Sequence, residues 1–135
     1  MGAKMFGARV ARLEDPALLT GRGNFTDDIH LPDFLEAAFV RSPHPHARIG
    51  AIDAAAARAH PGVHAVLTNQ DLPSELRHVT VPFQVPNPAI SQPLQQRLLE
   101  SEEVHFVGEP IALVMAESRY VAEDAAALVS IDYEV

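Results

Sequence analysis

The stretch TGRGNFTDDIHLP, residues 20–32, places two glycines beside an arginine, followed by two aspartates and a histidine. Gly21 and Gly23 could line a phosphate loop, because backbone N–H groups in glycine-rich loops bind phosphate. A dinucleotide fingerprint also needs a third glycine, a preceding strand and a following helix, and paired aspartates repel an anion. The pattern therefore favours a turn that glycine permits by taking a positive φ without strain.

Histidines offer a second chemistry, because imidazole nitrogen and carboxylate oxygen are common metal ligands. His44 and His46 would share one face of a strand, and His30 with Asp27 or Asp28 could complete a site. Prolines flank His44, however, and the spacing matches no established ligand motif. The pattern favours surface or hydrogen-bonded histidines, and a small metal-binding protein stays a third-ranked hypothesis.

Glu109 is the third candidate, between Gly108 and Pro110. A carboxylate there can act as an acid or base if the fold removes it from water. The sequence shows it no nearby partner, so a bulge or hairpin corner is favoured. No serine lies in a nucleophile elbow, and a chain without cysteine has no Cys–His pair. We therefore expect no catalytic, cofactor-binding or metal-binding residue here, and no catalysis by the chain alone.

Composition narrows the possible roles further. The 135 residues, 47% apolar and 21% charged, suffice for one domain with a buried core. The net charge of −8 argues against a nucleic-acid partner or an anionic membrane, both of which need a basic face. The absence of cysteine excludes disulfides and cysteine-held iron–sulfur clusters within this chain. No apolar run approaches the roughly 20 residues of a membrane span, so a cytoplasmic location is expected.

Apolar periodicity predicts an α+β domain. Strands are predicted at 35–42, 46–53, 63–68, 104–107, 111–116 and 129–135. The first two of these strands, joined by SPHP, are expected to form a hairpin or one bent strand. Helices are predicted at 53–62, with Asp53 as N-cap, and at 118–129, with Ser118 as N-cap.

Two segments lack such periods. Residues 1–15 are predicted to form an N-terminal arm, and Pro16 excludes a helix that continues from Arg9. Residues 69–101 contain five of the eleven prolines and are predicted to form a long loop with one helical turn at 92–100. Loops of this length usually serve a function or an interface, or are disordered. The chain ends on its best strand, so we expect 1–135 to be a single domain from a longer polypeptide.

Four ordered segments carry a resemblance to one family. They are RLEDPALLTGRGNFTDDIHLP (12–32), FVRSPHPHARI (39–49), HPGVHAVLT (60–68) and VHFVGEPIALVMAESRYVAEDAA (104–126). Together they resemble the start of the large subunit of molybdenum hydroxylases, which include xanthine dehydrogenase, aldehyde oxidase and aerobic carbon monoxide dehydrogenase. The arrangement is most similar to bacterial carbon monoxide dehydrogenase-type large subunits. The resemblance covers nearly the whole chain from about Met5 and weakens in the proline-rich loop.

The resemblance implies a fold and a context. The fold is the α/β-hammerhead, a small α+β unit with a mixed bent sheet and two main helices. Large subunits of this family bind molybdopterin cytosine dinucleotide or a related molybdenum cofactor, and partner subunits or domains carry two 2Fe–2S clusters and FAD. Substrate is oxidised with oxygen derived from water, and electrons pass from molybdenum through the clusters to FAD. The implied partners are the remaining large-subunit domains and the iron–sulfur and FAD subunits.

The resemblance carries no catalytic residue onto this chain. The family's glycine-rich pterin-binding segments and its glutamate base lie in later domains, so Glu109 is not that base. The role implied for this domain is architectural, and the substrate stays open. The alternative is a free-standing protein-interaction module without catalysis, which would use the proline-rich loop.

Two positions depart from the family pattern. Phe25 stands where many relatives carry tyrosine, and Asp33 where relatives often carry glycine. Aspartate can take a positive φ there at a modest cost. Within the opening stretch we expect Phe25 and Ile29 to be buried anchors, and Arg22 and His30 to be exposed.

Overall fold

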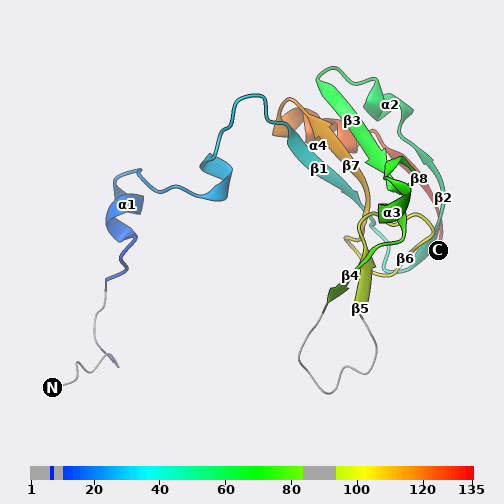
Figure 1. Cartoon of the computed structure of the whole chain (residues 1–135), viewed down its shortest axis with the longest axis horizontal. Coiled ribbons are helices and arrows are strands. Elements are labelled where there is room, and N and C mark those ends of the chain that lie inside the picture. The colour runs from blue at the N-terminus through cyan, green and yellow to red at the C-terminus, as the bar shows by residue number, and fades with distance from the viewer. Residues whose placement is uncertain (1–6, 8–10, 84–93) are drawn as a thin grey trace. The chain divides into compact units, whose positions relative to one another are not determined.

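The computed structural model describes residues 7, 11–83 and 94–135, and the chain divides into two compact units, 1–34 and 35–135 (Figure 1). In the first unit, helix α1 (Asp15–Leu19) holds Pro16 in its first turn, where the missing N–H loses no partner. The chain then turns at Gly21, whose φ is +67°, as the sequence predicts. A 3-10 turn, η1 (Thr26–Asp28), follows.

The described residues of the first unit enclose no core, since none of them is buried. The expectation that Phe25 and Ile29 are buried anchors is wrong, because they are 64% and 52% exposed. A unit of 34 residues is too short to bury much apolar surface within itself. Arg22 and His30 are exposed, as predicted. Asp33 takes φ +59°, the positive value considered for its position.

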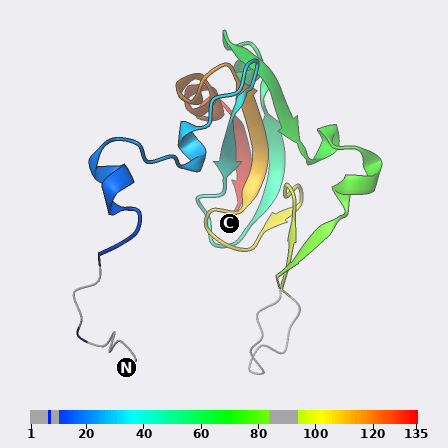
Figure 2. The ribbon, with the colours of Figure 1, turned by 60° about the vertical axis from the view of Figure 1, so that its left-hand side comes forward.

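Two antiparallel three-stranded sheets build the second unit (Figure 2). Sheet A has the order β1-β7-β3 and consists of β1 (Glu36–Arg41), β7 (Pro110–Ala116) and β3 (Val63–Thr68). Sheet B has the order β6-β2-β8 and consists of β6 (Glu103–Val104), β2 (Ala47–Asp53) and β8 (Ser130–Glu134). The strands β1 and β2 lie in different sheets, so they do not form the hairpin considered from sequence.

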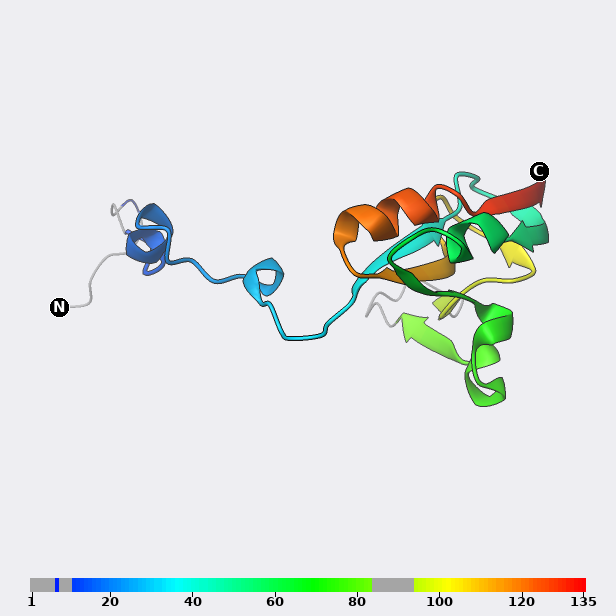
Figure 3. The same cartoon turned by 90° about the horizontal axis from the view of Figure 1, so that it is seen from above.

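Helices α2 (Ala55–Arg58) and α4 (Arg119–Ala126) both contribute alanines to the core behind one face of sheet A (Figure 3). This core joins Ala57 and Ala125 to Val66 and Val114 of the sheet. Alanines allow the helix backbones to approach the strands closely. A second core lies on sheet B and contains Ala47, Val104 and Ile111, so β7 supplies one residue to each core.

Both predicted helices begin with the expected side-chain contacts. The Asp53 carboxylate accepts a hydrogen bond from Ala55 N at 2.9 Å, although the N-cap position itself belongs to Ala54. Ser118 is the N-cap of α4, and its Oγ accepts from Val121 N at 3.3 Å. Each contact satisfies a backbone donor that the first helical turn leaves unpaired.

The segment 69–101 is more ordered than the predicted loop where the structure describes it. It contains η2 (Asn69–Asp71), α3 (Ser74–Arg77) and a hairpin of β4 (Thr80–Phe83) with β5 (Leu94–Arg97), which reaches away from the two sheets (Figure 1). The helical turn predicted at 92–100 is wrong for its described part, because 94–97 is a strand. Cross-strand pairing overrides the intrinsic helical preference of Leu-Gln-Gln-Arg.

The remaining strand predictions are confirmed for β1, β2, β3, β7 and β8. The strand predicted at 104–107 is only the two-residue β6, because the chain turns away from β2 after Val104. Among the described residues, no helix has both the length and the apolar character that a bilayer crossing requires.

Candidate functional site

Glu109 lies at a backbone corner where the loop after β6 enters β7. Gly108 takes φ +94° there, and the pairing of β1 with β7 shifts register between Val40 and Arg41. Ser42 closes the corner from both sides, donating from its N to Glu109 O at 2.9 Å and accepting from Gly108 N at 2.8 Å. Glu109 thus lies at a backbone corner, immediately before the irregular pairing of β1 with β7.

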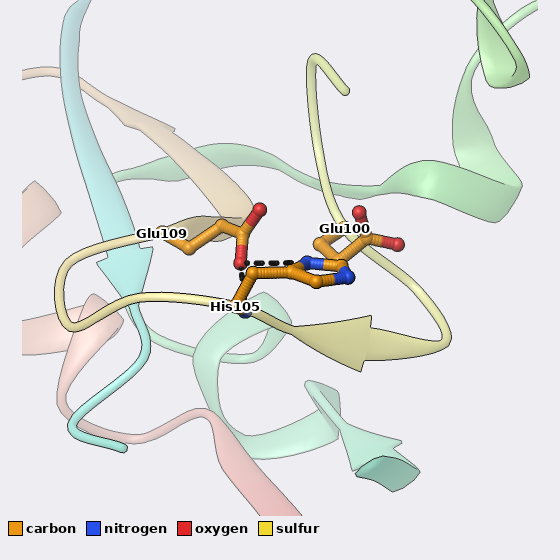
Figure 4. Close-up of side chains that lie close together, drawn as sticks. All are labelled: Glu100, His105 and Glu109. Carbon is orange, nitrogen blue, oxygen red and sulfur yellow. Dashed lines mark hydrogen bonds and ion pairs between the residues drawn. The ribbon is translucent and has the colours of Figure 1, made fainter. Parts of the chain in front are cut away.

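The Glu109 carboxylate is buried, with only 3% of the residue exposed. Its Oε2 accepts a hydrogen bond from the backbone N of His105 and lies 3.4 Å from His105 Nδ1 (Figure 4). This partner is not evident from the sequence. The loop between β6 and β7 folds back on itself here. A spacing of four residues outside a helix does not predict such a contact.

Glu100 is the second buried carboxylate of this region, 5% exposed. Its Oε1 accepts from Ser101 N at 3.0 Å and from Arg97 at 3.3 Å. The backbone N of Glu100 donates to Pro110 O at 2.8 Å, which ties the loop after β5 to the start of β7. Nothing in the sequence singled out Glu100, because its partners, the Ser101 N–H and the Arg97 side chain, match no functional motif.

Glu100, His105 and Glu109 form one cluster, and one ligand atom from each lies within 4.8 Å of the others. One imidazole and two carboxylates make a donor set that divalent cations accept. Both carboxylates, however, already accept backbone hydrogen bonds that close their own turns. Buried carboxylates need such partners, because an unpaired buried charge is costly. The cluster therefore holds the loop of residues 100–110 in place.

The histidines considered as metal ligands have other partners in the second unit. The His46 ring hydrogen-bonds Glu103, and this contact lowers the pKa of the Glu103 carboxyl. The His44 ring meets the Tyr133 ring edge-on, with centroids 4.8 Å apart, and burial raises the pKa of that phenol. The prediction of hydrogen-bonded histidines is confirmed for His46, and His30 lies exposed in the first unit.

The residues of the opening stretch serve local structure. Asp28 accepts from Phe25 N at 2.9 Å and so caps η1, and Arg22 Nε donates to Thr20 at 3.1 Å. A Cβ added at Gly23 would lie 2.9 Å from the end of the Leu18 side chain, so glycine lets the loop lie close against α1 without moving that side chain. These contacts support the turn favoured by the sequence.

A hollow of about 430 Å³ lies between β2, α2 and η2 and is polar. Its charged side chains are Arg58 and Asp71, whose closest atoms are 3.2 Å apart. Arg58 also donates to Val66 O, and Asp71 accepts from the N and the hydroxyl of Thr68. These Thr68 hydrogen bonds lower the pKa of the Asp71 carboxyl. The charges of the hollow are thus engaged in holding β3 to η2.

The chain matches a protein-family model. The family model described as aldehyde oxidase and xanthine dehydrogenase, a/b hammerhead domain, matches residues 20–135.

Two curated relatives are similar over almost the whole chain. The nicotine 6-hydroxylase large subunit of Paenarthrobacter nicotinovorans is 44% identical over 130 residues, which is 96% of this chain and 16% of that protein. The carbon monoxide dehydrogenase large chain of Afipia carboxidovorans is 43% identical over 129 residues, 95% of this chain and 15% of that protein. This chain thus spans about one sixth of the length of these relatives.

Among solved structures, the Cu,Mo-CO dehydrogenase in its carbon monoxide reduced state matches with a TM-score of 0.78. The two chains are 43% identical, and the match covers 96% of this chain and 15% of the other.

Proposed function

Because the chain belongs to the aldehyde oxidase and xanthine dehydrogenase a/b hammerhead family, we propose that it is the N-terminal structural domain of a molybdenum-hydroxylase large subunit. The family match over 20–135 carries this proposal. It is supported by 43% identity to a carbon monoxide dehydrogenase large chain, and the match also confirms the α/β-hammerhead fold expected from the sequence. On this proposal 1–135 belongs to one hammerhead domain, in which 1–15 is an arm.

The parent enzyme, on this proposal, oxidises its substrate with oxygen derived from water. Its large subunit would bind molybdopterin cytosine dinucleotide or a related molybdenum cofactor, and its partner subunits would carry 2Fe–2S clusters and FAD. A cytoplasmic parent fits a chain without cysteine, since cytoplasmic proteins rarely contain disulfides.

Among the residues that the structure describes, we find no arrangement that fits these cofactors. Iron–sulfur clusters need thiolate ligands, and the chain has no cysteine. A pyrophosphate needs grouped backbone donors at a helix N-terminus. The N-terminus of α4 is instead capped by Ser118, whose Oγ accepts from Val121 N. We therefore assign the cofactors to other domains and no catalytic, cofactor-binding or metal-binding residue to this chain.

Glu109 has a structural role in this proposal. Its carboxylate closes the loop of His105 and its backbone forms the corner into β7. The role proposed for the domain is accordingly architectural: it packs against the cofactor-binding domains and the neighbouring subunits.

The test is to sequence the genomic locus beyond codon 135 and to purify the native complex with an antibody against this chain. We expect molybdenum-binding domains encoded in the same frame or beside it, and molybdenum in the purified complex by elemental analysis. A locus without such domains would contradict the proposal. A captured complex built around an unrelated protein would favour the free-standing interaction module.

A further inference from the structure

Sheet A has apolar side chains on both faces. One face carries Ala38, Val66 and Val114, which line up across the strands and point to the helices α2 and α4. The residues that alternate with them point the other way. This outer face consists of Ala37 and Phe39 of β1, Leu113 and Met115 of β7, and Ala65 and Leu67 of β3.

The outer face is accessible as well as apolar. Phe39 is 47% exposed and Ala37 is exposed, while the four residues of β7 and β3 are half-buried. Strand register places Phe39 beside Leu113, which in turn pairs with Leu67. The apolar surface is therefore continuous across all three strands.

Sheet B provides a comparison within the same molecule. Its inner residues, such as Ile49 and Ile131, pack on the second core. Its exposed side chains include Arg48, Asp132 and Glu134. An antiparallel sheet with one face in water normally shows this alternation of apolar and polar residues. Sheet B follows this rule and sheet A does not. Apolar side chains on both faces are typical of a sheet that is covered on both sides.

The edge of the outer face is polar. The Arg41 guanidinium lies 5.0 Å from the Phe39 ring centroid and donates to Gly108 O at 2.8 Å. These two contacts hold the cation over the Phe39 ring, at the β1 end of the outer face. An uncharged centre beside a polar edge is the usual anatomy of a protein interface.

We propose that the outer face of sheet A is the surface by which this domain docks onto the molybdenum-binding part of its large subunit, an inference that rests on the proposed function. The relatives are about six times longer than this chain, so most of such a subunit lies outside it. The partner surface must be apolar, because none of the six side chains carries a charge. A second copy of the chain is disfavoured by its net charge of −8, since like charges repel.

The test compares two exposed alanines in strands of the two sheets. Ala37→Glu places a charge on the outer face of sheet A, and Ala51→Glu places the same charge on an exposed position of β2 in sheet B. Both variants are made in the whole large subunit produced from its own locus. Burying an unpaired carboxylate is costly, so Ala37→Glu should lower the yield of assembled subunit about tenfold or more. Ala51→Glu should leave the yield within about twofold of the unchanged protein.

Two further measurements keep the test decisive. Thermal unfolding of the 135-residue chain should give similar midpoints for both variants, which excludes a folding defect. Hydroxyl-radical labelling should modify Phe39 and Met115 in the free chain and spare them in the unchanged large subunit, whatever the fate of Ala37→Glu.

Each other outcome overturns the inference. Equal yields with Phe39 and Met115 still labelled in the large subunit would refute this surface and leave the proposed function standing. Dimers of the free chain that Ala37→Glu converts to monomers would make a second copy the occupant. A locus without molybdenum-binding domains would remove the proposed function, and this inference with it.

Discussion

Gly62 and Gly108 hold two corners of the second unit in a backbone conformation that other residues adopt only with strain. Their φ values are +84° and +94°. A Cβ at Gly62 would lie 3.2 Å from a Val121 methyl, whereas a Cβ at Gly108 would meet nothing within 4 Å. The pair separates the cost of backbone strain from the cost of crowding.

We expect Gly108→Ala to lower the free energy of unfolding by about 1 kcal/mol, the net of left-handed strain and a less flexible unfolded chain. Gly62→Ala should lower it by more, because Val121 on α4 must also move. Urea unfolding followed by circular dichroism measures both values. Equal losses of unfolding free energy in the two variants would show that the Val121 side chain moves aside without lowering stability.

At this scale the sequence predicted backbone demands better than side-chain partners. Gly21 and Asp33 have the positive φ values that were expected or allowed for them. Residue type alone limits φ, so such positions are readable without the fold. Whether Phe25 and Ile29 are buried, and whether His105 contacts Glu109, depends on which segments meet. The burial was predicted wrongly, and the contact was not predicted.

The 3-10 turn η2 shows how one carboxylate joins two elements. Asp71 accepts from Thr68 N at 2.8 Å and from its hydroxyl at 2.7 Å, and it also contacts Arg58 of α2. The Thr68 hydrogen bonds lower the pKa of Asp71, so the folded protein favours the ionised form. The resulting stability is complete above the unfolded pKa of about 3.9 and is lost as pH falls through the lower folded pKa.

We therefore expect Asp71→Asn to destabilise the chain at pH 7, and this difference from the unchanged protein should shrink as pH falls below about 4. Urea unfolding between pH 3 and 7 measures it. Asp132→Asn, which changes an exposed carboxylate on β8, is the control and should show a smaller difference. A difference that stays constant with pH would assign the effect to packing.

Elements with strong local signals could be predicted, and those that depend on pairing could not. The strand at β7 and the helix α4 follow from apolar runs and from Ser118 as a cap. The strand β5 has no such run, and it forms because β4 supplies backbone partners. The strand predicted at 104–107 is likewise limited by pairing, and only the two-residue β6 forms.

Every buried residue that the structure describes lies in the second unit. The two cores of that unit involve both sheets and the helices α2 and α4. The family and the α+β class were accessible from element order and from the resembling segments. The division into two sheets was not, because it is decided by which distant strands pair.

We expect a chain that begins at Leu35 to keep a cooperative thermal transition, with a midpoint within about 5 °C of the full chain, because the described core needs no residue before it. Differential scanning calorimetry of both chains measures this. Loss of the transition would show that the first 34 residues are needed for folding.

The place of β7 in sheet A has a consequence for protein synthesis. The central strand is made last of the three, since Glu36 of β1 pairs with Ala116 and Val63 of β3 pairs with the same residue. As the chain leaves the ribosome, β1 and β3 lack their common partner β7, and their apolar residues stay exposed until β7 has been made. Non-local pairing of this kind slows folding and leaves strand edges open to aggregation. We expect the nascent chain to depend on chaperones until β7 has emerged and closed the sheet.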